Sequence, residues 1–220
     1  PFMDSKDTAF DINLYSKSIY HFSDSGFGSN SNLGNDPFTE RRTGISLGLS
    51  RPTGDRQRAS VGLRFEGVKT TGSTNSINNF IQQDGIIGVL NFGYLVNTRD
   101  YDLDPSRGNW YNLTFEPGYS DINKIGGAIN DPSILGTNNF FRFMGEFRTY
   151  WSPQPPRTQE LDAARRVVAF RALAGTITGK VPFFEQFFAG GSTTLRGYQD
   201  DRFWGRNTLL TSLEYRHPLQ

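Results

Sequence analysis

The sequence lacks cysteine altogether and contains only two histidines, His21 and His217, among its 220 residues. Without cysteine, a disulfide framework, a thiolate metal site and a catalytic thiol are all excluded. Two histidines are too few to form a histidine cluster around a metal ion. We therefore expect neither a metal site nor a cofactor.

An excess of charge of one sign is also missing, because 23 lysines and arginines face 22 aspartates and glutamates. A chain so nearly neutral has no bulk field to attract nucleic acid, and we expect no nucleic-acid partner. The sequence also lacks a run of about eighteen apolar residues, which a spanning helix would need. Membrane-spanning strands stay open, because their alternating lipid-facing and lumen-facing residues hide the apolar half from hydropathy averages.

Aromatic residues and glycine are abundant instead. Aromatic residues make up 14% of the chain, with nineteen phenylalanines and nine tyrosines, and there are 24 glycines. This combination favours strands over helices. Hydrophobic residues reach only 35% of the chain, which is low for the packed core of a globular enzyme.

Alternation of apolar and polar residues with period two runs through most of the chain and predicts strands. For example, Ile45, Leu47 and Leu49 alternate with two serines and a glycine. We count about eight such segments of roughly 9–14 residues, a length that crosses a hydrocarbon layer at a tilt. The segments include residues 8–20, 45–50, 61–66, 90–97, 111–119, 141–148, 167–180 and 208–217.

The connections between these segments alternate in kind. Compact turns are expected at residues 52–57 and 97–108, and long polar loops at residues 22–42, 70–84 and 120–138. Short turns on one rim and long loops on the other are typical of an outer-membrane barrel. The exception is a proline-rich and charged linker at residues 152–166. The fold class that we predict is all-β, an antiparallel transmembrane β-barrel.

A soluble sandwich or a lipocalin-like barrel is the alternative, because it also alternates and also uses hairpins. Strand length argues against it, since strands of soluble proteins are usually shorter. The charges on the polar faces argue against it too, because they suit a wet lumen with paired side chains. These charges are Arg64, Glu66, Arg142, Glu146, Arg148, Glu214 and Arg216.

A glycine-rich segment places one arginine in an unusual setting. Gly190 and Gly191 precede Arg196, and Gly197 follows it. These glycines allow positive φ angles or a close approach to another surface, so the loop can aim the arginine inward. An enclosed guanidinium group needs a carboxylate or several carbonyl groups as partners.

Residues 190–198, Gly-Gly-Ser-Thr-Thr-Leu-Arg-Gly-Tyr, resemble the glycine-rich loop of the BamA/TamA superfamily of outer-membrane insertases and transporters. The flanking residues 181–188 and 213–219 are similar to the family's flanks. Residues 97–100, Asn-Thr-Arg-Asp, with a later proline and glycine, resemble the family's turn at the periplasmic rim. The matching positions are Gly190, Gly191, Leu195, Arg196, Gly197 and Tyr198 in the loop, and Arg99, Asp100, Pro105 and Gly108 in the turn.

The resemblance implies a sixteen-stranded barrel preceded by periplasmic POTRA domains. Residues 1–220 would be a partial barrel of about eight strands, resembling strands 5 to 12 of the family. The loop at about residues 181–207 would fold into the lumen between the eleventh and twelfth strands. Because an incomplete barrel has exposed strand edges, we expect the chain to be a fragment of a longer protein, with the POTRA domains and the other strands outside it.

Glu214 is the expected partner of Arg196, because it lies on the polar face of the strand after the loop and matches the family's inward acidic residue. We expect a buried pair in which the guanidinium fork holds the carboxylate. A purely structural role for Arg196, stiffening the lumen, remains the alternative. In the turn, Asp100 is expected to cap the chain reversal and Gly108 to supply a positive φ angle, without a direct role in function.

No catalytic residues are expected, since no histidine lies near the loop and no Gly-x-Ser-x-Gly motif is present. The resemblance implies an assembly factor that inserts and folds client β-barrel proteins in the outer membrane of a diderm bacterium, or the outer envelope of a derived organelle. Its implied partners are unfolded outer-membrane protein clients, outer-membrane lipids, POTRA domains of the same protein and accessory lipoproteins. A TamA-like or TpsB-type translocator, an outer-membrane enzyme and a passive porin remain alternatives.

Overall fold

A computed structural model describes residues 6–21, 38–72, 81–127, 131–156, 165–198 and 200–218. Within these ranges eight long strands form one sheet in the order β1-β2-β3-β4-β5-β6-β7-β10, and β8 pairs with β9. None of the helices in the described ranges is long and apolar enough to cross a membrane. The strands are β1 (Ala9–His21), β2 (Phe38–Gly54), β3 (Gln57–Gly72), β4 (Ile81–Asn97), β5 (Gly108–Gly127), β6 (Gly136–Trp151), β7 (Val167–Gly179), β8 (Phe187–Ala189), β9 (Phe203–Gly205) and β10 (Asn207–Arg216), and the 3₁₀ helices are η1 (Pro132–Ile134) and η2 (Phe183–Glu185).

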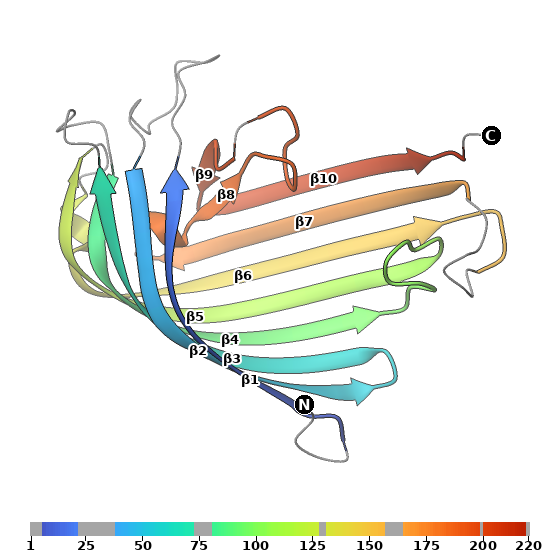
Figure 1. Cartoon of the computed structure of the whole chain (residues 1–220), viewed down its shortest axis with the longest axis horizontal. Helices are drawn as coiled ribbons and strands as arrows, with labels where there is room; N and C mark the ends of the chain where they lie inside the picture. Colours follow the sequence, from blue (N-terminus) through green and yellow to red (C-terminus); the bar gives the residue numbers. More distant parts are fainter. Residues whose placement is uncertain are drawn as a thin grey trace.

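The large sheet is an antiparallel meander that bends into a trough (Figure 1). Each strand from β1 to β7 pairs with its neighbour in the chain, and β10 pairs with β7. Between β7 and β10 the chain leaves the sheet and forms η2 and the β8–β9 hairpin. The all-β antiparallel prediction is confirmed. In the described ranges β1 and β10 stand at opposite ends of the strand order, so the sheet is open.

The two faces of the sheet differ as the alternation predicts. We call the face that contacts η2 the inner face and the opposite one the outer face. Large apolar side chains cover the outer face, where Phe92, Leu113 and Phe143 are 46%, 59% and 47% exposed. Exposed apolar area of this extent is unfavourable in water, so the outer face requires an apolar medium or a partner.

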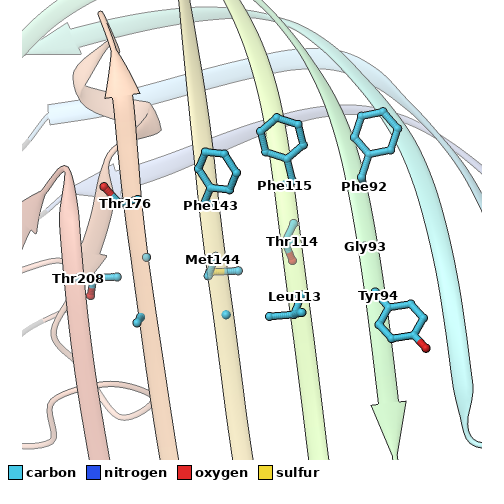
Figure 2. Close-up of a pocket in the computed structure, with 13 residues that line it drawn as sticks. Phe92, Gly93, Tyr94, Leu113, Thr114, Phe115, Phe143, Met144, Thr176 and Thr208 are labelled. Atoms are coloured by element: carbon cyan, nitrogen blue, oxygen red, sulfur yellow. The ribbon is translucent and has the colours of Figure 1, made fainter.

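Aromatic rings stack across neighbouring strands on the outer face. The centroids of the Phe92 and Phe115 rings lie 6.2 Å apart, and those of Phe115 and Phe143 lie 4.6 Å apart. Figure 2 shows these three rings beside a shallow hollow of about 640 Å³, which also reaches Leu113 and Tyr94. Cross-strand aromatic pairs of this kind fix the register of β4, β5 and β6.

The inner face is less polar than predicted. A buried apolar cluster lies there, and it includes residues of the connection that follows β7. The prediction of a wet lumen lined by paired charges therefore holds for only part of this face. The cluster consists of Val68, Ile87, Val89, Ile122, Ile134, Phe140, Ile177, Val181 and Phe184.

Five of the eight strands in the large sheet are longer than the predicted 9–14 residues, and β5 reaches 20 residues. The expected loop at residues 70–84 is partly strand, because its polar side chains pair with one another. Thr70 Oγ1 accepts a hydrogen bond from Gln83 N at 2.8 Å, and Asp84 Oδ1 accepts one from Thr70 N at 2.8 Å. The central parts of the predicted loops, at residues 22–37, 73–80, 128–130 and 157–164, lie outside the described residues.

We expect the substitution Gly118→Ala to destabilise the fold by about 1–3 kcal/mol, the usual cost of overpacking a core. A methyl group on Gly118 would lie 2.2 Å from the fully buried ring of Phe140. The measurement is the temperature at which the purified full-length protein loses its compact form on a heat-modifiability gel. Gly88→Ala is the matched control, because its methyl group would meet Phe65 at an ordinary 3.6 Å. Equal midpoints for the two variants would contradict the packing argument.

Candidate functional site

The connection after β7 turns directly onto the inner face of the sheet. Residues 181–185 are all buried, and Phe183 and Glu185 are only 1% and 2% exposed. Their backbone forms the single turn of η2, in which Glu185 N donates to Pro182 O at 3.1 Å. Proline suits the start of this turn because its φ angle is already fixed. The apolar neighbours thus carry one carboxylate into the interior.

Three arginines from three different strands surround the Glu185 carboxylate. Arg64 of β3 holds both of its oxygens, with Nη1 3.1 Å from Oε1 and Nη2 2.8 Å from Oε2. Arg42 of β2 donates to Oε1 at 3.0 Å, and Arg142 of β6 donates to Oε2 at 2.8 Å. Charge-assisted contacts of this kind, and above all the two-pronged one, fix geometry strongly. Glu185 therefore ties the connection to β2, β3 and β6 together.

The inner face of the large sheet, which we call the wall, supplies further carboxylates that pair with the same arginines. Arg42 pairs with Glu40 and, at 2.6 Å, with Glu66 Oε1. Arg64 also pairs with Glu66. Arg142 Nη1 lies 2.6 Å from Glu116 Oε2. Buried charges are tolerated only when they are paired in this way, so the network is a connected unit of arginines and glutamates.

Backbone groups of η2 are bound by the wall as well. Arg42 Nη2 donates to the carbonyl oxygen of Phe184 at 2.6 Å, and Arg142 Nη2 donates to the carbonyl oxygen of Glu185. Gln83 Oε1 accepts a hydrogen bond from Phe183 N at 2.7 Å. Irregular backbone inside a barrel needs such partners because unpaired buried groups are costly. The wall is built to receive this segment.

Aromatic contacts complete the attachment. The Arg42 guanidinium lies 5.4 Å from the centre of the Phe184 ring, and that of Arg142 lies 5.9 Å from Phe187. Opposite Phe187 the wall has Gly175, where a methyl group would lie 2.5 Å from the ring. The absence of a side chain at this glycine makes room for the ring.

The electrostatic surroundings keep Glu185 ionised. Glu185 lies in the connection between β7 and β10, outside the long strands. Burial alone would raise the pKa of its carboxyl group, but Arg64, Arg142 and Arg42 outweigh that effect and lower the pKa to about 2. The carboxylate therefore keeps its charge at every physiological pH.

We call Glu185 the anchor of the connection and residues 190–198 its tip. The tip has the conformation that its glycines suggest. Gly190, Gly191 and Gly197 have φ angles of 139°, 80° and 90°, which favour glycine. A methyl group on Gly191 would lie 1.6 Å from Asp200 Oδ1. Gly191 N donates to the carbonyl oxygen of Tyr198 at 3.0 Å, which closes the tip on itself.

Arg196 and Glu214 meet, but differently from the expected buried pair. Arg196 Nη2 lies 3.2 Å from Glu214 Oε1, and the two side chains are 77% and 41% exposed. The contact is a single hydrogen bond instead of a two-pronged one. Glu214 also faces Arg216 Nη2 at 3.3 Å. An exposed pair of this kind stabilises a fold by about 0–1 kcal/mol, so it guides the tip without locking it.

Asp100 organises the turn at residues 97–108. Its Oδ1 accepts hydrogen bonds from the backbone nitrogens of Tyr101, Ser106 and Arg107 at 3.0, 2.9 and 3.1 Å. Gly108 has a φ angle of 100°.

The other residues of this turn motif are structural in the same way. Arg99 Nη2 donates to Asp102 Oδ1 at 2.9 Å. Pro105 is buried. The hydrogen bonds of Arg99 and Asp100 and the burial of Pro105 are structural reasons for these residue types.

Sequence reasoning missed Glu185 as the anchor of the connection. It treated residues 181–188 only as a flank of the glycine-rich loop, although a lone acid in this apolar run was a usable signal. Arg64 and Arg142 were placed on the polar face, but their common partner was not found. In the described residues, no group of three or more His, Asp or Glu residues could hold a metal ion.

The antiparallel sheet has an apolar outer face, and the connection after β7 is fixed to its charged inner face. These features are typical of a membrane β-barrel protein with an inward-folded loop. A family model for the Omp85 superfamily domain matches residues 1–220, and the chain belongs to that superfamily. Members are non-enzymatic membrane assembly and transport proteins of the bacterial outer membrane. The family and the location predicted from the motifs are thus confirmed.

The chain is also similar to the outer membrane protein assembly factor BamA of Nitratidesulfovibrio vulgaris (strain Hildenborough). The two sequences are 23% identical over 198 residues, which cover 82% of this chain and 22% of that relative. The chain therefore spans about a fifth of the length of this relative.

We expect Glu185→Gln to release the connection from the wall and to cost about 3 kcal/mol, because one member of a buried charge network is lost. Since the chain has no cysteine, Val181→Cys can report release through its rate of maleimide labelling. Val181 is 6% exposed, so labelling should be slow in the single variant Val181→Cys. It should be fast in the double variant Val181→Cys/Glu185→Gln. The double variant Val181→Cys/Glu214→Gln is the matched control, and its labelling rate should equal that of Val181→Cys alone. Slow labelling in both double variants would refute the anchoring role.

The pH dependence of the anchor follows from its depressed pKa. A carboxyl group whose pKa falls from about 4.3 unfolded to about 2 folded stabilises the fold fully above the unfolded value. This contribution is lost as pH falls through about 2. The contribution of Glu185 to the thermal midpoint of the wild type should therefore change less between pH 8 and 5 than between pH 4 and 2. The difference between wild-type and Glu185→Gln midpoints measures this contribution, and it should shrink only in the acidic range.

Proposed function

We propose that the chain is the partial barrel of an outer-membrane protein assembly factor, which inserts and folds client β-barrel proteins. Membership of the Omp85 superfamily and the similarity to a BamA protein support this proposal. In this proposal residues 1–220 form one partial barrel domain that corresponds to strands 5 to 12 of sixteen. Residues 181–207 form its lumen loop, and POTRA domains and the remaining strands belong to the rest of the protein.

The observation that carries the proposal is the fixed connection on the inner face. A passive porin needs a polar, water-filled interior. Here Val181 and Phe184 pack into an apolar cluster with residues of the wall, and Glu185 binds three wall arginines. An interior so occupied favours a protein that works on its barrel wall over one that conducts solutes.

The proposed mechanism is physical and needs no cofactor. A weak seam between the first and last strands of the complete barrel would offer a free strand edge to a client. The client strand would add by backbone hydrogen bonds, helped by local thinning of the bilayer. The strands of this chain would form the rigid part of the wall, and the loop would keep that part in shape while the seam opens. Unfolded client proteins, POTRA domains and accessory lipoproteins are the proposed partners.

In this mechanism Arg196 positions the tip of the loop against Glu214 of β10. We expect Arg196→Ala to impair client assembly and to lower barrel stability slightly, because an exposed pair contributes about 0–1 kcal/mol. The measurements are growth and the amounts of folded outer-membrane proteins in cells that rely on the variant. Arg56→Ala, in the β2–β3 turn, is the control. Wild-type growth with unchanged heat-modifiable migration would argue against a role for Arg196.

Depletion of the full-length protein separates assembly from translocation. An assembly factor should lower the folded amounts of many unrelated barrel proteins. A TamA-like or TpsB-type translocator should instead block the export of one protein or a few, and barrels in general should remain. The latter outcome would overturn the assembly proposal and leave the superfamily assignment intact.

A further inference from the structure

The outer face changes from apolar to polar at a matching level on β1, β2 and β3, toward the end of β1, the start of β2 and the end of β3. Cross-strand register places the last apolar outward residues and the first polar or small ones side by side. Because the apolar band of a membrane barrel matches the hydrocarbon layer, this boundary marks the start of the lipid headgroup region. The steps are Leu14 to Ser16 on β1, Ile45 to Thr43 on β2 and Phe65 to Gly67 on β3.

Two cations stand just beyond this boundary. Arg41 and Lys69 lie directly opposite each other in the β2–β3 ladder, and both are exposed. Like charges in directly opposed positions destabilise a sheet unless an anion lies between them. Within the described ranges, neither side chain has an ion-pair partner or a hydrogen bond.

A pocket of about 610 Å³ lies between these cations. Gly67 has no side chain to fill the pocket, and Thr43 and Asn123 line it with polar groups. The only carboxylate in the lining is that of Asp84, whose Oδ1 already accepts from the backbone and hydroxyl of Thr70 at 2.8 and 3.2 Å. The lining therefore has two cationic groups and one carboxylate, which leaves one positive charge in excess.

We propose that Arg41 and Lys69 bind the phosphate group of an anionic membrane lipid. The guanidinium fork of Arg41 fits phosphate oxygens in pairs, and the ammonium group of Lys69 adds a second charge. The acyl chains of the lipid would continue along the apolar band, beginning at Ile86 in the same pocket. This inference rests on the outer-membrane location and is independent of the branch of the superfamily.

The rest of the outer face provides an internal comparison. The hollow in Figure 2 is lined by aromatic, aliphatic and small residues and by threonines, and no charged side chain is in its lining. That hollow can hold acyl chains but offers nothing to a phosphate group. The pocket at Arg41 and Lys69 combines cationic groups with the edge of the apolar band, which is the arrangement that a phosphate-bearing lipid requires.

The test compares lipid retention by the full-length protein in mixed micelles that contain phosphatidylglycerol or phosphatidylcholine, measured by native mass spectrometry. The double variant Arg41→Gln/Lys69→Gln should lose roughly fivefold in phosphatidylglycerol affinity per cation removed, or roughly 25-fold in all. The charge-conserving exchange Arg41→Lys/Lys69→Arg should retain most of the binding. Lys17→Gln/Arg56→Gln, which removes the same net charge elsewhere, should bind as the wild type does.

Two results would overturn the proposal. One is equal retention of phosphatidylglycerol by the wild type and the Arg41→Gln/Lys69→Gln variant, with both migrating as folded barrels. The other is full displacement of the lipid by millimolar inorganic phosphate, which would make the pocket a site for a free anion. Phosphatidylcholine retention should be the same for all variants, since the acyl contacts are unchanged.

Discussion

The contact on which the inner half of this structure depends is the buried carboxylate of Glu185 among three arginines. Removing an ionised group from water costs several kcal/mol, and the fold recovers that cost only if every partner is in place. Arg42, Arg64 and Arg142 come from β2, β3 and β6, so the curvature of the sheet must bring all three to one point. One charge on the loop thus constrains the shape of the wall, and the wall constrains the path of the loop.

The apolar cluster beneath η2 follows from that constraint. Once Glu185 is fixed, Val181 and Phe184 are held against Val68, Ile87 and Phe140 of the wall. The inner face is therefore part hydrophobic core and part charge network, whereas the outer face is left to an apolar medium. A soluble barrel would reverse this assignment, with its largest apolar side chains inside. Here many large apolar side chains lie exposed on the outer face instead, so that face needs an apolar medium or a partner, and the outer-membrane family supplies the first.

The sequence predicted most of the strand arrangement because period-two alternation depends only on near neighbours. It missed the strand ends at Thr70 and Asp84, where polar side chains suggest a loop but hydrogen-bond across the β3–β4 hairpin. The pair of Arg196 and Glu214 could be predicted because both residues lie in recognisable motifs. Glu185 could not be assigned its partners, since they are separated from it by 43 to 143 residues. Spacing in the sequence carries no information about which inward arginines converge after the sheet has curved.

The two attachments of the loop differ in kind, and the difference has a mechanical consequence. Glu185 is buried and held by several charge-assisted contacts, whereas Arg196 and Glu214 share one hydrogen bond in the open. A contact worth about 0–1 kcal/mol breaks and re-forms thermally, but a buried network does not. The base of the loop is therefore part of the wall, and the tip can respond to events near β10. Gly190 and Gly191, with positive φ angles at the start of the tip, let the chain change direction where the rigid part ends.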